Sequence, residues 1–254
     1  MKHKRTALVV GVGLCLILLV TLAQWVMAPI HKLNDWEKPI EASRAKNGPW
    51  PVNTAPLDSL QRELALRKAL LELPKKDSVH LLINLADSSI NLFMNGLTIY
   101  QAKATGIEVD PLIKRLNTSV YWAQWSIPRK TVFSQANIVK EPVIEKVAPK
   151  TQEEFLASVT SPDSLIYDPA FVHLALDNGT QLILSDEANK FGGRTGRKLY
   201  SAYRWRRRGV FLKSVITFSQ YTYEPKVYLE AENKALTAIY RALPEQPKVV
   251  IYYR

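Results

Sequence analysis

Glu224, Pro225, Lys226 and Tyr228 are the residues whose types and spacing most directly raise the question of chemistry. They lie in a segment that the pattern predicts to be a loop, directly ahead of a short amphipathic helix and a terminal strand at Lys248–Tyr253. A lysine can act as a nucleophile only when its environment desolvates it strongly, because it is otherwise protonated. The sequence therefore predicts a cleft at this loop and leaves open whether the cleft reacts with a ligand or only binds it.

A serine–histidine pair is the other candidate for nucleophilic chemistry. Ser219 precedes the loop in a segment predicted to be a strand, and His173 lies on a predicted strand face with Phe171 and Ala175. No acidic residue is placed by its spacing to orient the histidine, and a histidine on a strand is more often structural. A serine-based hydrolase remains only an alternative at this stage.

Metal and cofactor sites are not indicated. The four histidines are isolated in the chain, and no His-x-His, paired-carboxylate or HExxH spacing occurs. The one cysteine, Cys15, lies inside an apolar segment near the N-terminus. The chain beyond that segment has no thiol, which excludes disulfides, thiolate metal sites and a cysteine nucleophile there.

Positive charge is concentrated in two places. The chain has a net charge of +11, of which Met1–Arg5 supplies three charges and Arg194–Arg208 supplies seven without an intervening acid. The second group is interleaved with Tyr200, Tyr203 and Trp205, so it could contact phosphates and stack on rings. It consists of Arg194, Arg197, Lys198, Arg204, Arg206, Arg207 and Arg208.

Two interpretations of this basic stretch stay open. Uncompensated charge of this density is typical of a site for anionic lipid headgroups, another polyanion or an acidic partner. The alternative is a twisted hairpin whose arginines face water. Nucleic acid is not expected, because the N-terminal segment predicts that the rest of the chain leaves the cytoplasm.

The N-terminal segment Ala7–Ile30 contains 24 residues without a charge and follows Lys2, Lys4 and Arg5. About 20 such residues cross a bilayer as a helix. The pattern predicts a retained single-pass anchor in the plasma (inner) membrane, with the C-terminal domain periplasmic or extracellular. A cleaved signal peptide, with a site near Thr21-Leu22-Ala23, is the alternative.

The rest of the chain divides into two parts after this Met1–Ile30 tip and anchor. His31–Asp77 predicts a proline-containing stalk and a short helix, capped by Thr54 and bearing a stripe of leucines at positions 57, 60, 64 and 71. Ser78–Arg254 predicts a mainly antiparallel β domain with peripheral helices, one of them around Gln152–Ala157.

The strands of this domain are expected in three groups. HLLINLADSSINLFMNGLTIYQAKATG predicts three strands joined by turns at Asp87-Ser88-Ser89 and Asn95-Gly96. Phe171–Ser185 predicts a second hairpin around Asp177-Asn178-Gly179. The segment VFLKSVITFSQYTY predicts a further strand.

Two stretches resemble the L,D-transpeptidase (YkuD-like) catalytic domain. VHLLINLADSSINLFMNGLTIYQAKATG is similar to the family's opening hairpin, and ENKALTAIYRALPEQPKVVIYYR is similar to its closing helix and strand. The resemblance implies an antiparallel β-sandwich-like domain in the bacterial envelope that faces peptidoglycan. It also implies acyl transfer between stem peptides through a cysteine.

The residues of that reaction are missing. Alignment of the closing helix places the family's Cys near Lys226, its Arg near Tyr228 and its His-Gly on Glu224-Pro225, and none of these matches. A proline also supplies no backbone N–H for an oxyanion hole.

The leading hypothesis is therefore an envelope protein with a degenerate L,D-transpeptidase-like domain that binds peptidoglycan or a cell-wall synthesis partner. An enzyme with a non-cysteine nucleophile and a module that binds anionic membranes through Arg194–Arg208 are the alternatives.

Overall fold

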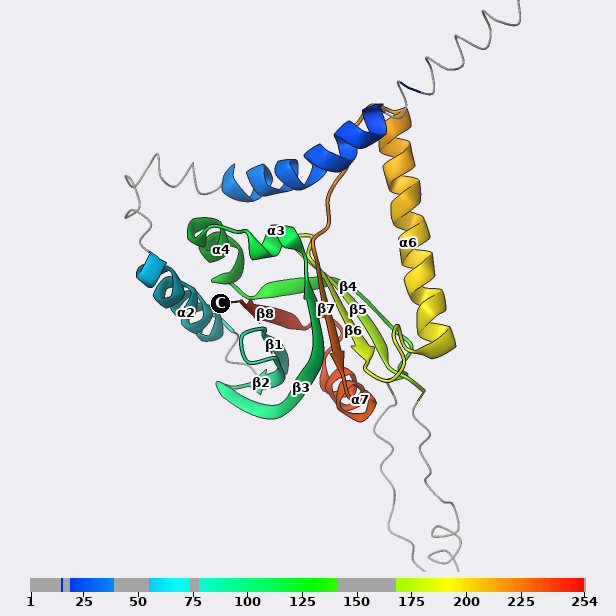
Figure 1. The fold of residues 1–254 in the computed structure, drawn as a ribbon. Helices are drawn as coiled ribbons and strands as arrows, with labels where there is room; N and C mark the ends of the chain where they lie inside the picture. Colours follow the sequence, from blue (N-terminus) through cyan, green and yellow to red (C-terminus); the bar gives the residue numbers. More distant parts are fainter. Residues whose placement is uncertain (1–14, 16–18, 39–54, 74–77, 141–167, 254) are drawn as a thin grey trace, which may run out of the picture.

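The computed structural model describes residues 15, 19–38, 55–73, 78–140 and 168–253 as an α+β fold built on a closed barrel of eight strands (Figure 1). The strands follow the order β1-β2-β3-β7-β6-β5-β4-β8, and β8 closes the barrel against β1. Their bounds are His80–Asn84 (β1), Ser89–Met94 (β2), Leu97–Val109 (β3), Arg129–Ala136 (β4), Phe171–Leu176 (β5), Gln181–Asp186 (β6), Lys226–Ala231 (β7) and Lys248–Tyr252 (β8).

The hairpins predicted from the sequence are confirmed. Strands β1, β2 and β3 pair antiparallel in sequence order, and β5 pairs with β6 across the Asp177-Asn178-Gly179 turn. Asn95 and Gly96 both have positive φ values, 49° and 87°. This is the backbone of a type I′ turn, whose twist matches that of the flanking strands.

The domain is mainly antiparallel as predicted, but the prediction of a sandwich is wrong, because the sheet closes into a barrel, and two of its strand pairings are parallel. β1 pairs parallel with β8, and β6 pairs parallel with β7. Parallel neighbours require a crossover connection. Between β6 and β7 the helix α6 (Gly193–Ile216) lies within that connection, so the basic stretch is part of a β–α–β unit.

Helices contribute side chains to the core of the barrel. The interior contains Leu174, Leu184 and Leu229 from the strands. Val120 and Trp125 reach it from α4 (Thr118–Trp125), and Leu236 and Ile239 reach it from α7 (Asn233–Ala242). A short helix, α3 (Pro111–Lys114), follows β3.

The N-terminal parts of the chain belong to the same body. A helix at residues 19–38 covers the first eight positions of the predicted stalk, and its Trp36 is buried in the barrel core. The helix α2 (Ala55–Leu71) packs on α4 and β8 and contributes Ala65 to that core. The core therefore extends across the boundary predicted at Ser78.

The helix α2 packs on the barrel, but not through the predicted leucine stripe. Leu60, Leu64 and Leu71 are exposed, whereas Ala65 and Ala69 are fully buried. Small residues let the helix approach the barrel closely, and the leucines are left on the outer side. Thr54 and the expected helix around Gln152–Ala157 lie outside the described residues.

Among the described residues, no helix combines the length and apolar character needed to cross a bilayer. Residues 7–14 and 16–18 of the predicted anchor lie outside them. The described part of the segment presents Leu19, Leu22 and Trp25 as exposed side chains.

Candidate functional site

The candidate site lies on the outer face of β5, β6 and β7. Along these strands Val172, Leu182 and Val227 point into the barrel core, while Phe171, Ile183 and Tyr228 form a separate outer cluster. The strand register places His173 beside Ile183, Ile183 beside Tyr228, and Tyr228 beside Glu108. Side chains from four strands thus form one row, and α6 passes across it (Figure 1).

Lys226 and Tyr228 occupy this row as strand residues, so the prediction of a loop up to Tyr228 is wrong. The sequence Lys-Val-Tyr-Leu-Glu-Ala alternates and forms β7, with Val227 and Leu229 inward and Lys226 and Tyr228 outward. Glu224 and Pro225 precede the strand, and the carbonyl of Pro225 accepts a hydrogen bond from the amide of Gln181 at 2.8 Å. The four residues are nevertheless brought to one place.

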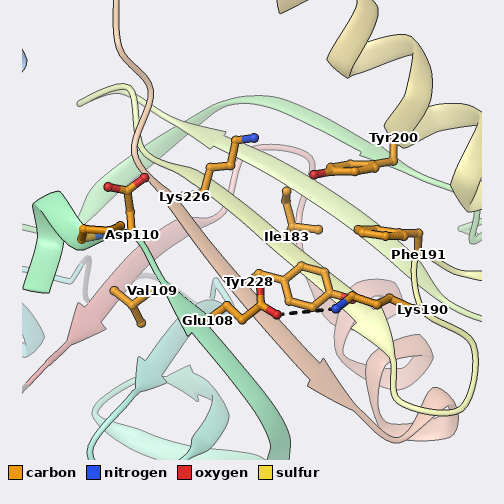
Figure 2. A pocket seen from close by; sticks show the side chains of 10 residues that line it. Glu108, Val109, Asp110, Ile183, Lys190, Phe191, Tyr200, Lys226 and Tyr228 are labelled. Atoms are coloured by element: carbon orange, nitrogen blue, oxygen red, sulfur yellow. Dashed lines mark hydrogen bonds and ion pairs between the residues drawn. The ribbon is translucent and has the colours of Figure 1, made fainter. Parts of the chain in front are cut away.

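A cleft of about 290 Å³ opens over the row. Figure 2 shows Lys226 and Asp110 at one side of it and the rings of Phe191, Tyr200 and Tyr228 at the other. Its lining comes from β3, the start of α3, β6, the segment before α6, α6 and β7, and consists of Glu108, Val109, Asp110, Pro111, Ile183, Lys190, Phe191, Tyr200, Lys226 and Tyr228.

Phe191 is the strained residue of the cleft. Its φ is 64°, a left-handed conformation that costs a bulky side chain about 1–3 kcal/mol. Its amide donates to the hydroxyl of Ser185 at 2.7 Å, and its ring stacks on Tyr200 with centroids 4.3 Å apart. The backbone is thus held so that the ring faces the cleft, and residues with such backbone strain cluster at functional sites.

Charged groups line both sides of the aromatic platform. The Nζ of Lys190 lies 3.5 Å from the Glu108 carboxylate and 3.8 Å from that of Glu230. The hydroxyl of Tyr228 donates to Glu230 at 3.1 Å. Burial, and then the hydrogen bond to Glu230, raise the pKa of Tyr228 to about 12, so its hydroxyl is a donor at neutral pH.

Lys226 has no carboxylate of the described residues within ion-pairing distance. Its Nζ lies 5.5 Å from the centre of the Tyr203 ring. Burial lowers the pKa of Lys226, and the Arg207 guanidinium lowers it further, while Glu224 and Asp110 act in the opposite direction. A half-buried cation in such surroundings gains from an anionic ligand that enters the cleft.

Glu224 is engaged elsewhere. Its carboxylate accepts a hydrogen bond from the Tyr203 hydroxyl at 3.1 Å and lies 3.4 Å from Nε of Arg207. Arg207 also donates to the Tyr221 hydroxyl at 2.7 Å. Burial raises the pKa of Tyr203, and the charge and hydrogen bond of Glu224 raise it further. This network fixes the segment before β7 against α6.

The basic stretch is a helix and not a hairpin. Arg194 and Arg208 are separated by about 21 Å along α6 at 1.5 Å per residue, so the seven charges form no single patch. Arg194, Arg197 and Lys198 are exposed near its N-terminus. The later residues divide, with Arg207 facing the barrel, Arg206 lying over Phe133, and Arg204 and Arg208 flanking a second cavity.

Ser219 and His173 are not brought together. Ser219 follows α6 instead of lying on a strand, and its hydroxyl bonds with that of Thr217 at 2.8 Å. Nε2 of His173 lies 2.7 Å from the side-chain oxygen of Gln181. The ring of His173 packs edge-on against Tyr203, with centroids 4.5 Å apart. His173 therefore has a structural position under α6.

Protonation of His173 is expected to destabilise the fold. Its pKa lies below the ordinary 6.5, chiefly because of burial and also because of Arg206 and Lys226, although Gln181 and Glu224 oppose the shift. The unfolded chain therefore binds more protons, and stability falls as the pH drops through 6.5 towards the folded-state pKa. The slope from one such group is at most about 1.4 kcal/mol per pH unit.

Unfolding by urea at pH 7.5 and pH 5 checks this prediction. His173→Gln is expected to show a smaller loss of stability between the two pH values than the unchanged chain. His80, whose pKa burial also lowers, supplies a second share that His80→Gln would remove. An equal pH dependence in His173→Gln and the unchanged chain would contradict the assignment.

Metal binding finds no support in the described part of the chain, where no three His, Cys, Asp or Glu residues are grouped to hold an ion. Cys15 is exposed and remote in sequence from every residue that lines the cleft. The chemistry that the lining itself offers is ionic contact, hydrogen bonding and ring stacking.

Several lining residues were missed in the sequence. Glu108 lies near the end of β3, which continues beyond Gly106, Asp110 follows that strand as the N-cap of α3, and Phe191 precedes a Gly-Gly pair. Asp110 did carry a signal, since an acidic residue before proline is a common helix N-cap. Its carboxylate accepts from the amide of Leu112 at 2.9 Å and from the Tyr223 hydroxyl at 2.6 Å.

Comparisons with protein-family models, with characterised proteins and with solved structures give no match to this chain. They do not identify an L,D-transpeptidase domain.

Proposed function

We propose that this chain is a membrane-anchored cell-envelope protein whose barrel binds peptidoglycan or a cell-wall partner without catalysing transpeptidation. The binding site would be the cleft at Lys226 and Tyr228. The observation that carries the proposal is the combination of the Phe191–Tyr200 ring stack with Lys226, a half-buried cation that lacks a carboxylate partner among the described residues.

A glycopeptide fits this lining chemically. Sugar rings present apolar C–H faces that pack on aromatic side chains, and peptide stems present carboxylates. Phe191 and Tyr228 would take the ring, and Lys226 would take a carboxylate through a charge-assisted hydrogen bond. The cleft volume of about 290 Å³ suits one sugar or a short peptide portion, with the rest of the polymer outside.

The absence of transpeptidation follows from the residues at the corresponding positions. The resemblance places a catalytic cysteine near Lys226, and Cys15 is the chain's one cysteine. Pro225 has no backbone N–H to donate to an oxyanion. We therefore assign the cleft to binding and keep an enzyme with a non-cysteine nucleophile as the alternative to be tested.

The membrane anchor is part of the same proposal. The part of Ala7–Ile30 that precedes Trp25 would hold the protein in the plasma (inner) membrane, with the barrel periplasmic or extracellular, since Ala28 is buried against the protein. The exposed apolar side chains of Leu19, Leu22 and Trp25 support contact of this segment with lipid.

Phe191→Gly tests the binding site with little disturbance of the fold. Glycine adopts a φ of 64° freely, so relief of strain offsets part of the packing lost with a half-buried ring. We expect the affinity for soluble peptidoglycan fragments to fall about tenfold, measured by calorimetry on the full chain in a neutral detergent.

Phe218→Gly is the matched control. Phe218 also has a left-handed backbone, with a φ of 52°, but it is 79% exposed and does not line the cleft. Its removal should leave fragment affinity unchanged. Failure of the unchanged chain to bind any fragment would overturn the proposal.

The same samples decide between binding and catalysis. Incubation of the full chain with stem-peptide donors is expected to give neither cross-linked nor exchanged product by mass spectrometry. Product that disappears in Lys226→Met, with the melting temperature unchanged, would instead establish the enzyme with a lysine nucleophile.

A further inference from the structure

A second cavity, of about 370 Å³, lies between the helix at residues 19–38, α6 and the segment before β7. It shares only Asp110 and Lys226 with the cleft. Its other lining residues are Trp25, Ala28, Arg204, Arg207, Arg208, Phe211, Tyr221, Tyr223 and Glu224. The cleft function proposed above does not require this cavity.

The charged side chains that line this cavity carry a net positive charge. Glu224 is held by Arg207 and Tyr203, and Asp110 by Tyr223 and the amide of Leu112. Arg204 and Arg208 contact rings instead, at 6.0 Å from Tyr200 and 5.1 Å from Trp205. Among the described residues no carboxylate forms an ion pair with Arg204, Arg208 or Lys226, and the cations of the lining outnumber its two carboxylates, Asp110 and Glu224.

The cavity lies near an apolar end of the molecule, where Trp25 belongs to its lining. Gln24 donates to the carbonyl of Ser219 at 2.9 Å and accepts from the amide of Tyr221 at 3.1 Å, which ties the N-terminal helix to the segment after α6. Figure 1 shows the helix at residues 19–38 meeting the C-terminal end of α6 there. The exposed side chains around the junction are Leu22 (51%), Trp25 (72%), Leu212 (57%), Ile216 (76%) and Phe218 (79%).

The sequence indicates what this end of the molecule contacts. The apolar run Ala7–Leu18 leads directly into the helix at residue 19 and is itself preceded by Lys2, Lys4 and Arg5. An apolar rim with tryptophan at its edge and arginines behind it is the arrangement of a bilayer-water boundary. Guanidinium groups bind phosphate oxygens in pairs of parallel hydrogen bonds.

We propose that this cavity binds the phosphate headgroup of an anionic membrane lipid, with Arg204 and Arg208 as its ligands. The acyl chains would run along the exposed side chains of Trp25, Leu212 and Ile216. Phe211 forms the inner apolar wall. The lipid would seat the cavity end of the barrel at the bilayer surface.

Native mass spectrometry of the full chain in neutral detergent tests the site. Phosphatidylglycerol is expected to bind more tightly than phosphatidylcholine. Arg204→Gln/Arg208→Gln should lower phosphatidylglycerol affinity about 30-fold, since each cation near an anionic headgroup contributes roughly one kcal/mol. Both arginines are exposed, so the variant should fold, and its melting temperature checks this.

Arg194→Gln/Arg197→Gln is the matched control, because it removes the same charge from the same helix outside the cavity. Its affinity should stay close to that of the unchanged chain. An equal loss in both double variants would reduce the effect to general electrostatic attraction and overturn the site.

Further results distinguish a lipid from a free phosphate as the ligand, and distinguish binding in this cavity from binding in the cleft. Equal binding of the two lipids would overturn the proposal. Glycerol phosphate or inorganic phosphate binding as tightly as phosphatidylglycerol would overturn its lipid source. If Arg204→Gln/Arg208→Gln folds poorly, Trp25→Ala is the variant to measure instead. It is expected to lose phosphatidylglycerol binding. Glycopeptide affinity in Arg204→Gln/Arg208→Gln should be retained, because neither arginine lines the cleft.

Discussion

Gly196→Ala is expected to lower the free energy of unfolding by about 1–3 kcal/mol, the usual cost of overpacking a tight contact. A Cβ at this position would collide with the backbone carbonyl oxygen of Phe191 and would lie 2.7 Å from Cβ of Phe171. Neither atom is the end of a flexible side chain, so α6 as a whole has to move. Gly196 therefore sets how closely the helix approaches the barrel.

Gly209→Ala in the same helix is expected to have the opposite effect. No atom lies within 4 Å of a Cβ built at Gly209, and alanine is favoured over glycine in a helix by about 1 kcal/mol. Thermal unfolding separates the two variants, since 1 kcal/mol corresponds to roughly 2–4 °C in a chain of this size. A Gly196→Ala chain as stable as Gly209→Ala would contradict the close approach.

The displacement expected in Gly196→Ala also reaches the cleft. Tyr200 is one turn further along α6 and stacks on Phe191, and Tyr203 contacts His173 and Glu224. A shift of α6 should therefore weaken fragment binding as well as stability. Gly209→Ala should leave binding unchanged, because Gly209 lines neither cavity.

The local elements of the fold were largely predictable from the sequence. Alternating apolar residues and turn-forming pairs identify β1, β2, β3, β5 and β6, because hairpin partners are adjacent in the chain. The closure of the barrel was not predictable in this way. The parallel pairings β1–β8 and β6–β7 join segments far apart in sequence, and no local pattern records them.

The helix α6 shows how a local pattern misleads. Its last part, Val-Phe-Leu-Lys-Ser-Val-Ile, is rich in β-branched and aromatic residues and was predicted to be a strand. In the structure the residues facing the barrel recur at helical spacing, as Gly196, Tyr200, Tyr203 and Arg207. Contacts with β5 and β7 hold this earlier part of α6, and the last part continues the same helix despite its β propensity.

Only part of the candidate site could be predicted from the sequence. Lys226 and Tyr228 were identified together because they are close in the sequence. Phe191 and Glu108 reach them only through the register of β3, β6 and β7 and through the backbone strain at Phe191. A cleft assembled from distant strands cannot be read from residue types alone.

Phe171→Ala is expected to cost about 3–5 kcal/mol of stability, the range for removing a buried aromatic side chain from a core. Phe171 is 1% exposed and packs with Ile183 and Tyr228 beneath the cleft, edge-on to Tyr200 at 6.2 Å. Phe171→Leu should lose less, because it refills much of the space. Urea unfolding of the full chain measures both losses.

This substitution also distinguishes support of the site from contact with the ligand. Phe171 does not line the cleft, but Tyr200, which contacts its ring edge-on, and Tyr228, which belongs to the same buried cluster, do line it. Phe171→Ala should therefore weaken fragment binding, and Phe171→Leu should recover most of it. Lys226→Met, by contrast, should weaken binding without a comparable loss of stability, since its half-buried cation is replaced by an apolar chain of similar length. Full affinity in a folded Phe171→Ala chain would mean that the ring platform does not hold the ligand, and the cleft would then bind through its charges alone.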